Sequence, residues 1–187
     1  AGEGFGKHPH DNMEIISIPL SGELKHGDSM GNTTVIKEGE VQVMSAGTGI
    51  IHSEMNNRTD MAVQFLQIWI FPDKKNVMPR YDQKLIDKES VTNRLGEIVS
   101  PNEGEEGVWI NQQAWFYLGE FSDNQTIEYL TKNRENGIYI FLLEGEATID
   151  AHKLNRRDAI AVTEAEVLSI DISKDSKILV MEVPMTW

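Results

Sequence analysis

Short runs rich in valine, isoleucine, threonine and aromatic residues dominate this sequence, and glycine, asparagine or aspartate stand between one run and the next. Examples are EIISIPLSG, AVQFLQIWIF and GIYIFLLEGEATID. Such runs, bounded by turn residues, are typical of β-strands, and long stretches with helical periodicity are absent. Many short strands separated by turns predict an all-β fold, either a barrel or a sandwich.

The strands are expected to fall into two units. Residues 71–84 contain two prolines and mixed charge, which is typical of a connection. The two halves of the sequence are also similar to each other, because IPLSGELKHG in the first half resembles FLLEGEATIDAH in the second half. We therefore expect a duplicated arrangement, with an N-terminal domain over residues 1–83 and a C-terminal domain over residues 84–187.

Composition limits the chemistry available to the chain. Cysteine is absent, so disulfides, iron–sulfur clusters, thiolate zinc sites and cysteine nucleophiles are excluded, and any metal must be held by imidazole and carboxylate. A formal net charge of −13 repels a phosphate backbone, so we expect no direct nucleic-acid binding. No apolar run is long enough to span a bilayer and no signal-peptide pattern opens the sequence. We therefore expect a cytoplasmic protein without membrane contact.

Two pairs of residues carry the strongest chemical signal. His8 and His10 stand two residues apart, and so do His52 and Glu54. Side chains at i and i+2 of a strand point to the same face, so two facing strands present three imidazoles and one carboxylate to a single ion. Such a set leaves two positions of an octahedral shell open for dioxygen and a chelating substrate, or for water. We expect a metal site formed by these four residues.

Neighbouring residues are expected to support this site. Gly47 is expected in a tight turn with positive φ before the strand of His52, and Pro9 suits an edge or bulged strand because it lacks an N–H donor. Glu14 is expected to hydrogen-bond a ligand, and His26 is expected to be a satisfied structural histidine. The tryptophans are expected in the core or in packing between the domains: Trp69, Trp109, Trp115 and Trp187.

Two spacings resemble the paired motifs of the cupin superfamily: Gly2, His8, His10, Glu14 and Gly22 for the first motif, and Gly47, Gly49, His52 and Asn56 for the second. Three segments are similar to sequences of the pirin family of bicupins: GFGKHPHDNMEI, GELKHGDSMGN and VQVMSAGTGIIHSEMN. This similarity is specific through about residue 83 and diffuse afterwards.

The resemblance implies two tandem cupin barrels of the double-stranded β-helix, or jelly-roll, type. Pirin-like chains usually begin with a further segment of strands, so the N-terminal barrel is expected to be truncated at its start. That barrel is expected to hold a non-haem Fe(II) ion through His8, His10, His52 and Glu54, although Mn, Co, Ni, Cu or Zn would also suit the set. The second half contains only His152, so its barrel is expected to lack a metal.

The resemblance also implies two alternative functions. The first is a dioxygenase that cleaves quercetin-type flavonols with O2, in which Glu54 takes the enol proton of the substrate. The second is a non-enzymatic, iron-dependent redox sensor or transcription cofactor that acts by binding a protein partner. The sequence therefore leaves it open whether the chain is an enzyme.

Overall fold

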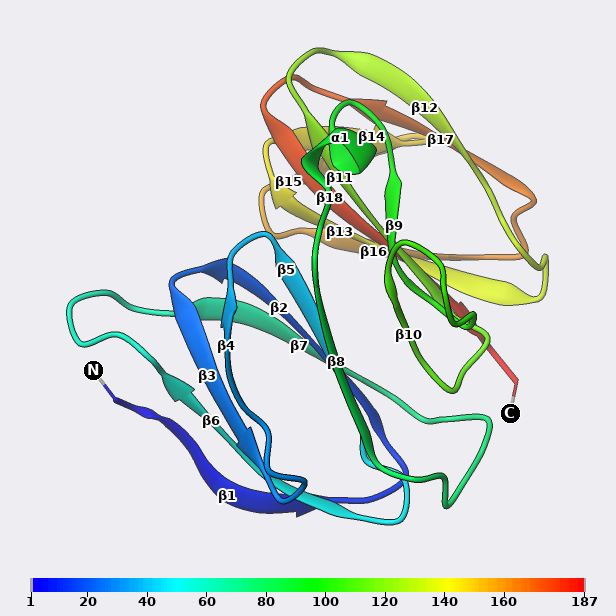
Figure 1. Cartoon of the computed structure of the whole chain (residues 1–187). Coiled ribbons are helices and arrows are strands. Elements are labelled where there is room, and N and C mark those ends of the chain that lie inside the picture. The colour runs from blue at the N-terminus through cyan, green and yellow to red at the C-terminus, as the bar shows by residue number, and fades with distance from the viewer. Residues whose placement is uncertain (1, 187) are drawn as a thin grey trace. The chain divides into compact units, whose positions relative to one another are not determined.

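The computed structural model describes residues 2–186 of the chain (Figure 1). Two compact units are present: Ala1–Ile86 with Pro101–Gln112 form unit 1, and Asp87–Ser100 with Gln113–Trp187 form unit 2. Both are built from strands, and among residues 2–186 the helical content is one short α-helix. The expected all-β class is confirmed. Among the described residues, no helix has the length and the apolar character needed to cross a membrane.

Unit 1 contains two four-stranded sheets, with strand orders β1-β6-β3-β4 and β7-β2-β5-β8. Neighbouring strands in both sheets are antiparallel. The strand bounds are β1 Gly4–His10, β2 Glu14–Ser21, β3 Glu23–Asp28, β4 Thr33–Lys37, β5 Glu40–Ser45, β6 Ile50–Asn56, β7 Gln64–Ile70, β8 Arg80–Leu85 and the short β10 Val108–Trp109. Strand β8 begins within residues 71–84, the segment expected to be a connection, and it pairs with β5.

The two sheets of unit 1 face each other. Ser17 of β2 donates a hydrogen bond to Glu54 of β6 at 3.2 Å, and Thr34 of β4 hydrogen-bonds Tyr81 of β8 at 2.5 Å. An apolar cluster contains side chains from both sheets: Ile15, Met44, Ala46 and Ile50. Strand β2 lies between two neighbours and is buried over residues 14–19, which explains its nearly continuous apolar run.

Strand β1 carries a bulge next to its two histidines. Phe5 lies opposite Glu54 and His8 lies opposite His52, so three steps along β1 match two steps along β6. The extra residue bends the strand and changes the direction of the side chains that follow it. β1 is also an edge strand of its sheet, which confirms the position expected for Pro9.

The turn between β5 and β6 depends on Gly47. Its φ of 49° lies in the left-handed region, and a β-carbon at this position would collide with the backbone carbonyl of Val77. The Thr48 N–H donates to that same carbonyl at 2.9 Å, and the Asn12 N–H donates to the Gly47 carbonyl at 2.9 Å. The expected positive-φ glycine is confirmed, and it sets where the strand with two of the predicted ligands begins.

Unit 2 also contains two sheets of antiparallel neighbours, β9-β11-β18-β13-β16 and β12-β17-β14-β15. Buried residues of both sheets share one apolar core, to which β17 contributes every second residue. The bounds are α1 Lys88–Val91, β9 Gly96–Ser100, β11 Trp115–Phe121, β12 Gln125–Leu130, β13 Asn136–Glu144, β14 Glu146–Ile149, β15 His152–Asn155, β16 Ala159–Thr163, β17 Val167–Ile172 and β18 Ser176–Pro184.

A fully buried carboxylate, that of Glu182, holds one end of unit 2 together. It accepts hydrogen bonds from the Tyr129 hydroxyl at 2.6 Å, from the backbone N–H groups of Lys132 and Asn133 at 2.9 and 3.0 Å, and from the Asn136 amide at 2.7 Å. Burial, followed by this contact with Glu182, raises the pKa of Tyr129. The loop that precedes β13 is therefore tied to β18 by one side chain.

Candidate metal centre

Three predicted ligands converge between the sheets of unit 1. The ring centroids of His8, His10 and His52 lie 4.4 Å (His8 to His52), 4.9 Å (His8 to His10) and 5.0 Å (His10 to His52) apart. Imidazoles that bind one ion through bonds of about 2.1 Å, at right angles to one another, would have centroids about 4.5 Å apart. The trio therefore has the spacing of three ligands on one face of an octahedral ion.

Hydrogen bonding leaves ring nitrogens of the trio available. His8 Nδ1 contacts the Gly6 carbonyl oxygen at 2.7 Å within the bulge, so Nδ1 carries the proton and Nε2 keeps its lone pair. His10 Nε2 and both ring nitrogens of His52 are buried, with no hydrogen-bond partner among the described residues. Buried polar atoms are rarely left without partners, and a bound cation would satisfy His10 Nε2 and one ring nitrogen of His52.

The electrostatics of the site favour the neutral form of two of these imidazoles, those of His10 and His52. Burial, followed by the neighbouring His8, His10 and His26, lowers the pKa of His52 to about 3. Burial, followed by His8, also lowers the pKa of His10. Imidazole must be neutral to bind a metal, so near neutral pH these two side chains are in the form that an ion requires.

The fourth predicted ligand, Glu54, lies two residues after His52 on β6 and opposite Phe5 of β1. Ligand atoms of His8, His10 and His52 lie within 4.8 Å of one another, and those of His26, His52 and Glu54 form a second group within the same limit. Glu54 thus adjoins the trio through His52. Its carboxylate is buried and accepts hydrogen bonds from Ser17 and Gln67.

Two neighbouring residues differ from expectation. His26 is not satisfied, because its Nδ1 is buried without a hydrogen-bond partner in the described part of the chain. Glu14 does not reach a ligand but accepts hydrogen bonds from Ser45 at 2.7 Å and Asn111 at 3.1 Å. Burial raises the pKa of Glu14, partly offset by these bonds and by the guanidinium of Arg80.

Sequence reasoning missed Gln67 and misplaced Trp69. Trp69 was expected in the core or in packing between the domains, but 53% of its surface is exposed and its ring meets that of His10 edge-on, with centroids 4.9 Å apart. Its indole N–H donates to Gln67 Oε1 at 3.2 Å, while Gln67 Nε2 donates to Glu54. The sequence does contain one indication that Gln67 and Trp69 lie together. They stand two residues apart on β7, and side chains two residues apart on a strand point to the same face. Trp187 lies outside the described residues.

The amino-acid sequence matches the Pirin family over residues 1–70 and the family described as "Quercetinase C-terminal cupin domain" over residues 97–183. A curated relative, "Quercetin 2,3-dioxygenase" of Escherichia coli (strain K12), is 34% identical over 185 residues, which are 98% of this chain and 78% of the relative. The chain belongs to the pirin family.

Solved structures agree with this membership. The crystal structure of YhhW from Escherichia coli matches all of this pirin with a TM-score of 0.93 at 33% identity, over 78% of the YhhW chain. A second structure, of bacterial pirin YhhW in complex with nickel(II), matches with a TM-score of 0.92 at 32% identity, over 79% of that chain. The cupin fold expected from the sequence is therefore confirmed.

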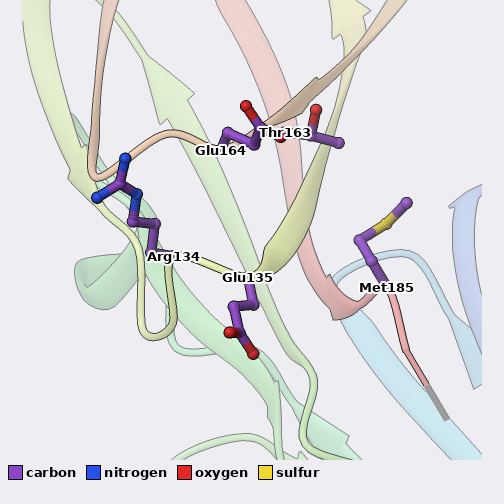
Figure 2. A pocket seen from close by; sticks show the side chains of 5 residues that line it. All are labelled: Arg134, Glu135, Thr163, Glu164 and Met185. Carbon is purple, nitrogen blue, oxygen red and sulfur yellow. The ribbon is translucent and has the colours of Figure 1, made fainter.

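A surface hollow of about 560 Å³ in unit 2 of this pirin is a different kind of feature. Figure 2 shows the residues that line it: Arg134, Glu135, Thr163, Glu164 and Met185. All five are exposed, and Arg134 pairs with Glu166 at 3.1 Å. The hollow contains no histidine and no buried polar group, so the chemistry of this pirin points to unit 1.

Proposed function

We propose that this pirin is a metal-dependent dioxygenase that cleaves quercetin-type flavonols with O2, with Fe(II) held by His8, His10, His52 and Glu54. The carrying observation is the convergence of three imidazoles, two of which, those of His10 and His52, have buried nitrogens without hydrogen-bond partners among the described residues. The name of the E. coli relative supports the reaction, and the nickel(II) complex of YhhW supports a divalent ion. An ion held by these residues would supply Lewis-acid chemistry toward the hydroxyl and carbonyl oxygens of the flavonol and redox chemistry toward dioxygen.

Glu54 is proposed to accept the enol proton of the flavonol. Its two oxygens are held by Ser17 and Gln67, and each carboxylate oxygen has a second lone pair for another contact. A base must stand within hydrogen-bond reach of the proton that it removes, and the two donors keep Glu54 in one orientation. Gln67 is thus a positioning residue for the proposed base.

Trp69 is proposed to orient the planar substrate. Its half-exposed indole stands edge-on to His10, and the hydrogen bond to Gln67 limits rotation of the ring. An aromatic ring fixed in this way can contact a flat aromatic substrate through its exposed face. Replacing Trp69 with Leu should therefore raise KM for a flavonol more than it lowers kcat.

The test is aerobic turnover of quercetin by protein loaded with Fe(II), together with metal analysis of the same sample. We expect about one ion per chain and loss of the visible absorbance of the flavonol. His8→Ala should lower both occupancy and turnover, whereas His152→Ala, a change on an exposed strand of unit 2, should lower neither. Metal loading without turnover would overturn the dioxygenase and favour the iron-dependent binding protein instead.

A further inference from the structure

His26 is a buried histidine that the proposed reaction does not use. It lies on β3 directly opposite Glu54, and its neighbour Asp28 lies opposite His52. Only 1% of His26 is exposed, and its ring centroid is 5.5 Å from that of His52 and 4.9 Å from that of Tyr81. The ring therefore borders the metal centre from the side opposite to β1.

The hydrogen bonds around His26 determine which ring nitrogen keeps a lone pair. Its Nε2 lies 3.1 Å from an oxygen of Asp28, and that carboxylate is fixed by the Asn32 amide at 2.8 Å and the Met30 N–H at 2.9 Å. A carboxylate accepts, so Nε2 donates and Nδ1 is left bare. Metal-binding histidines are typically oriented in this way, with the second ring nitrogen donating to a carboxylate.

A purely structural role does not account for the bare nitrogen. His26 Nδ1 is buried without a hydrogen-bond partner among residues 2–186, and an unsatisfied buried acceptor destabilises a fold. Ligand atoms of His26, His52 and Glu54 lie within 4.8 Å of one another, and no more than 2% of any of these residues is exposed. Two imidazoles and one carboxylate are a common ligand set for divalent transition metals.

We propose that His26, His52 and Glu54 form a second ion position, which shares His52 and Glu54 with the first position and has His26 in place of His8 and His10. A neutral imidazole has one nitrogen with a free lone pair, so His52 serves one position at a time and the chain holds one ion. With two imidazoles and one carboxylate, the second position has fewer nitrogen ligands than the first and suits harder ions such as Mn(II) better than the first position does. The assignment goes beyond the dioxygenase and does not depend on its turnover.

The test uses the full chain with His8 and His10 both replaced by Ala, which removes the first position. The five histidines are then reduced to three, His26, His52 and His152. With the imidazoles labelled with ¹⁵N, titration with Zn(II) should shift the ring nitrogens of His26 and His52 and leave those of His152 unchanged. Adding Asp28→Asn should weaken Zn(II) binding by about 10- to 100-fold, because the orienting carboxylate is lost.

Two results would overturn the proposal. One is a folded double variant, verified by circular dichroism, in which Zn(II) leaves the nitrogens of His26 unchanged. The other is undiminished Zn(II) binding after His26→Gln is added to that variant. If the double variant does not fold, the same ¹⁵N spectra are recorded for the chain without substitutions. Added Mn(II) should broaden the ring-nitrogen signals of His26 more than those of His8 only if the second position exists. Flavonol turnover enters none of these measurements.

Discussion

Acid is expected to destabilise the metal-free protein through His52. Its pKa is lowered from 6.5 to about 3, first by burial and then by His8, His10 and His26. Below pH 6.5 the unfolded chain binds a proton that the folded chain does not, so the free energy of unfolding falls as the pH drops from 6.5 toward 3. At about 1.4 kcal/mol per pH unit, the whole interval sets an upper limit of about 5 kcal/mol.

The part of this interval that is easily measured is smaller. A titration from neutral pH to about pH 4.5 crosses about two pH units of the interval between 6.5 and 3. The free energy of unfolding should fall by at most about 3 kcal/mol over these two units. His8 and His10 are only partly buried, so water screens their charges, and we expect about 2 kcal/mol. The loss is a property of the metal-free protein, because a bound ion would hold His52 in its neutral form.

The assay is urea unfolding after dialysis against a chelator, repeated across this pH range. His52→Gln should flatten the pH dependence by about 2 kcal/mol relative to the parent protein, and His152→Gln, at an exposed position, should reproduce the parent curve. Protonation of carboxylates contributes equally to all three proteins, so the difference between the curves isolates His52. An equally steep fall in His52→Gln would refute the reasoning.

Three further predictions concern single side chains. Glu54→Gln should keep most of the metal but lower turnover about 100-fold, the usual effect of removing a general base; equal losses of metal and turnover would show that Glu54 is only a ligand. Glu182→Ala should lower the free energy of unfolding by about 3–5 kcal/mol, because four hydrogen bonds lose their acceptor, and a loss below about 1 kcal/mol in urea would contradict this. Gly47→Ala should destabilise more than Gly31→Ala, since both have positive φ but only Gly47 faces the Val77 carbonyl; equal thermal shifts would exclude a role for that carbonyl.

The sequence predicted well those features that depend on neighbours along the chain. The period of two along a strand placed His8 and His10 on one face, and the positive φ of Gly47 followed from glycine before a new strand. The all-β class followed from the strand-like runs. Each of these inferences uses residues only a few positions apart, where local sterics decide the outcome.

Features that depend on the pairing of distant strands could not be predicted. The register that sets His26 opposite Glu54 joins β3 to β6, and nothing in either strand alone specifies it. Gln67 reaches Glu54 only because β7 borders β2. The alternation of side chains along a strand shows which residues share a face, but it does not show which other strand lies opposite that face. For that reason, the residues that sequence reasoning missed are those that reach the site from strands other than β1 and β6, which carry the predicted ligands.

The chain passes between the two units three times, because residues 87–100 belong to unit 2 and residues 101–112 return to unit 1. The returning segment supplies Asn111 to the buried carboxylate of Glu14, and its Trp109 lies under Arg80, 3.8 Å from ring centroid to guanidinium carbon. During synthesis, unit 1 therefore cannot complete its contacts until residue 112 has left the ribosome, and by then part of unit 2 has already been made. A single cut of the chain cannot yield both units intact, so a fragment ending at residue 86 would leave Glu14 without its donor from Asn111.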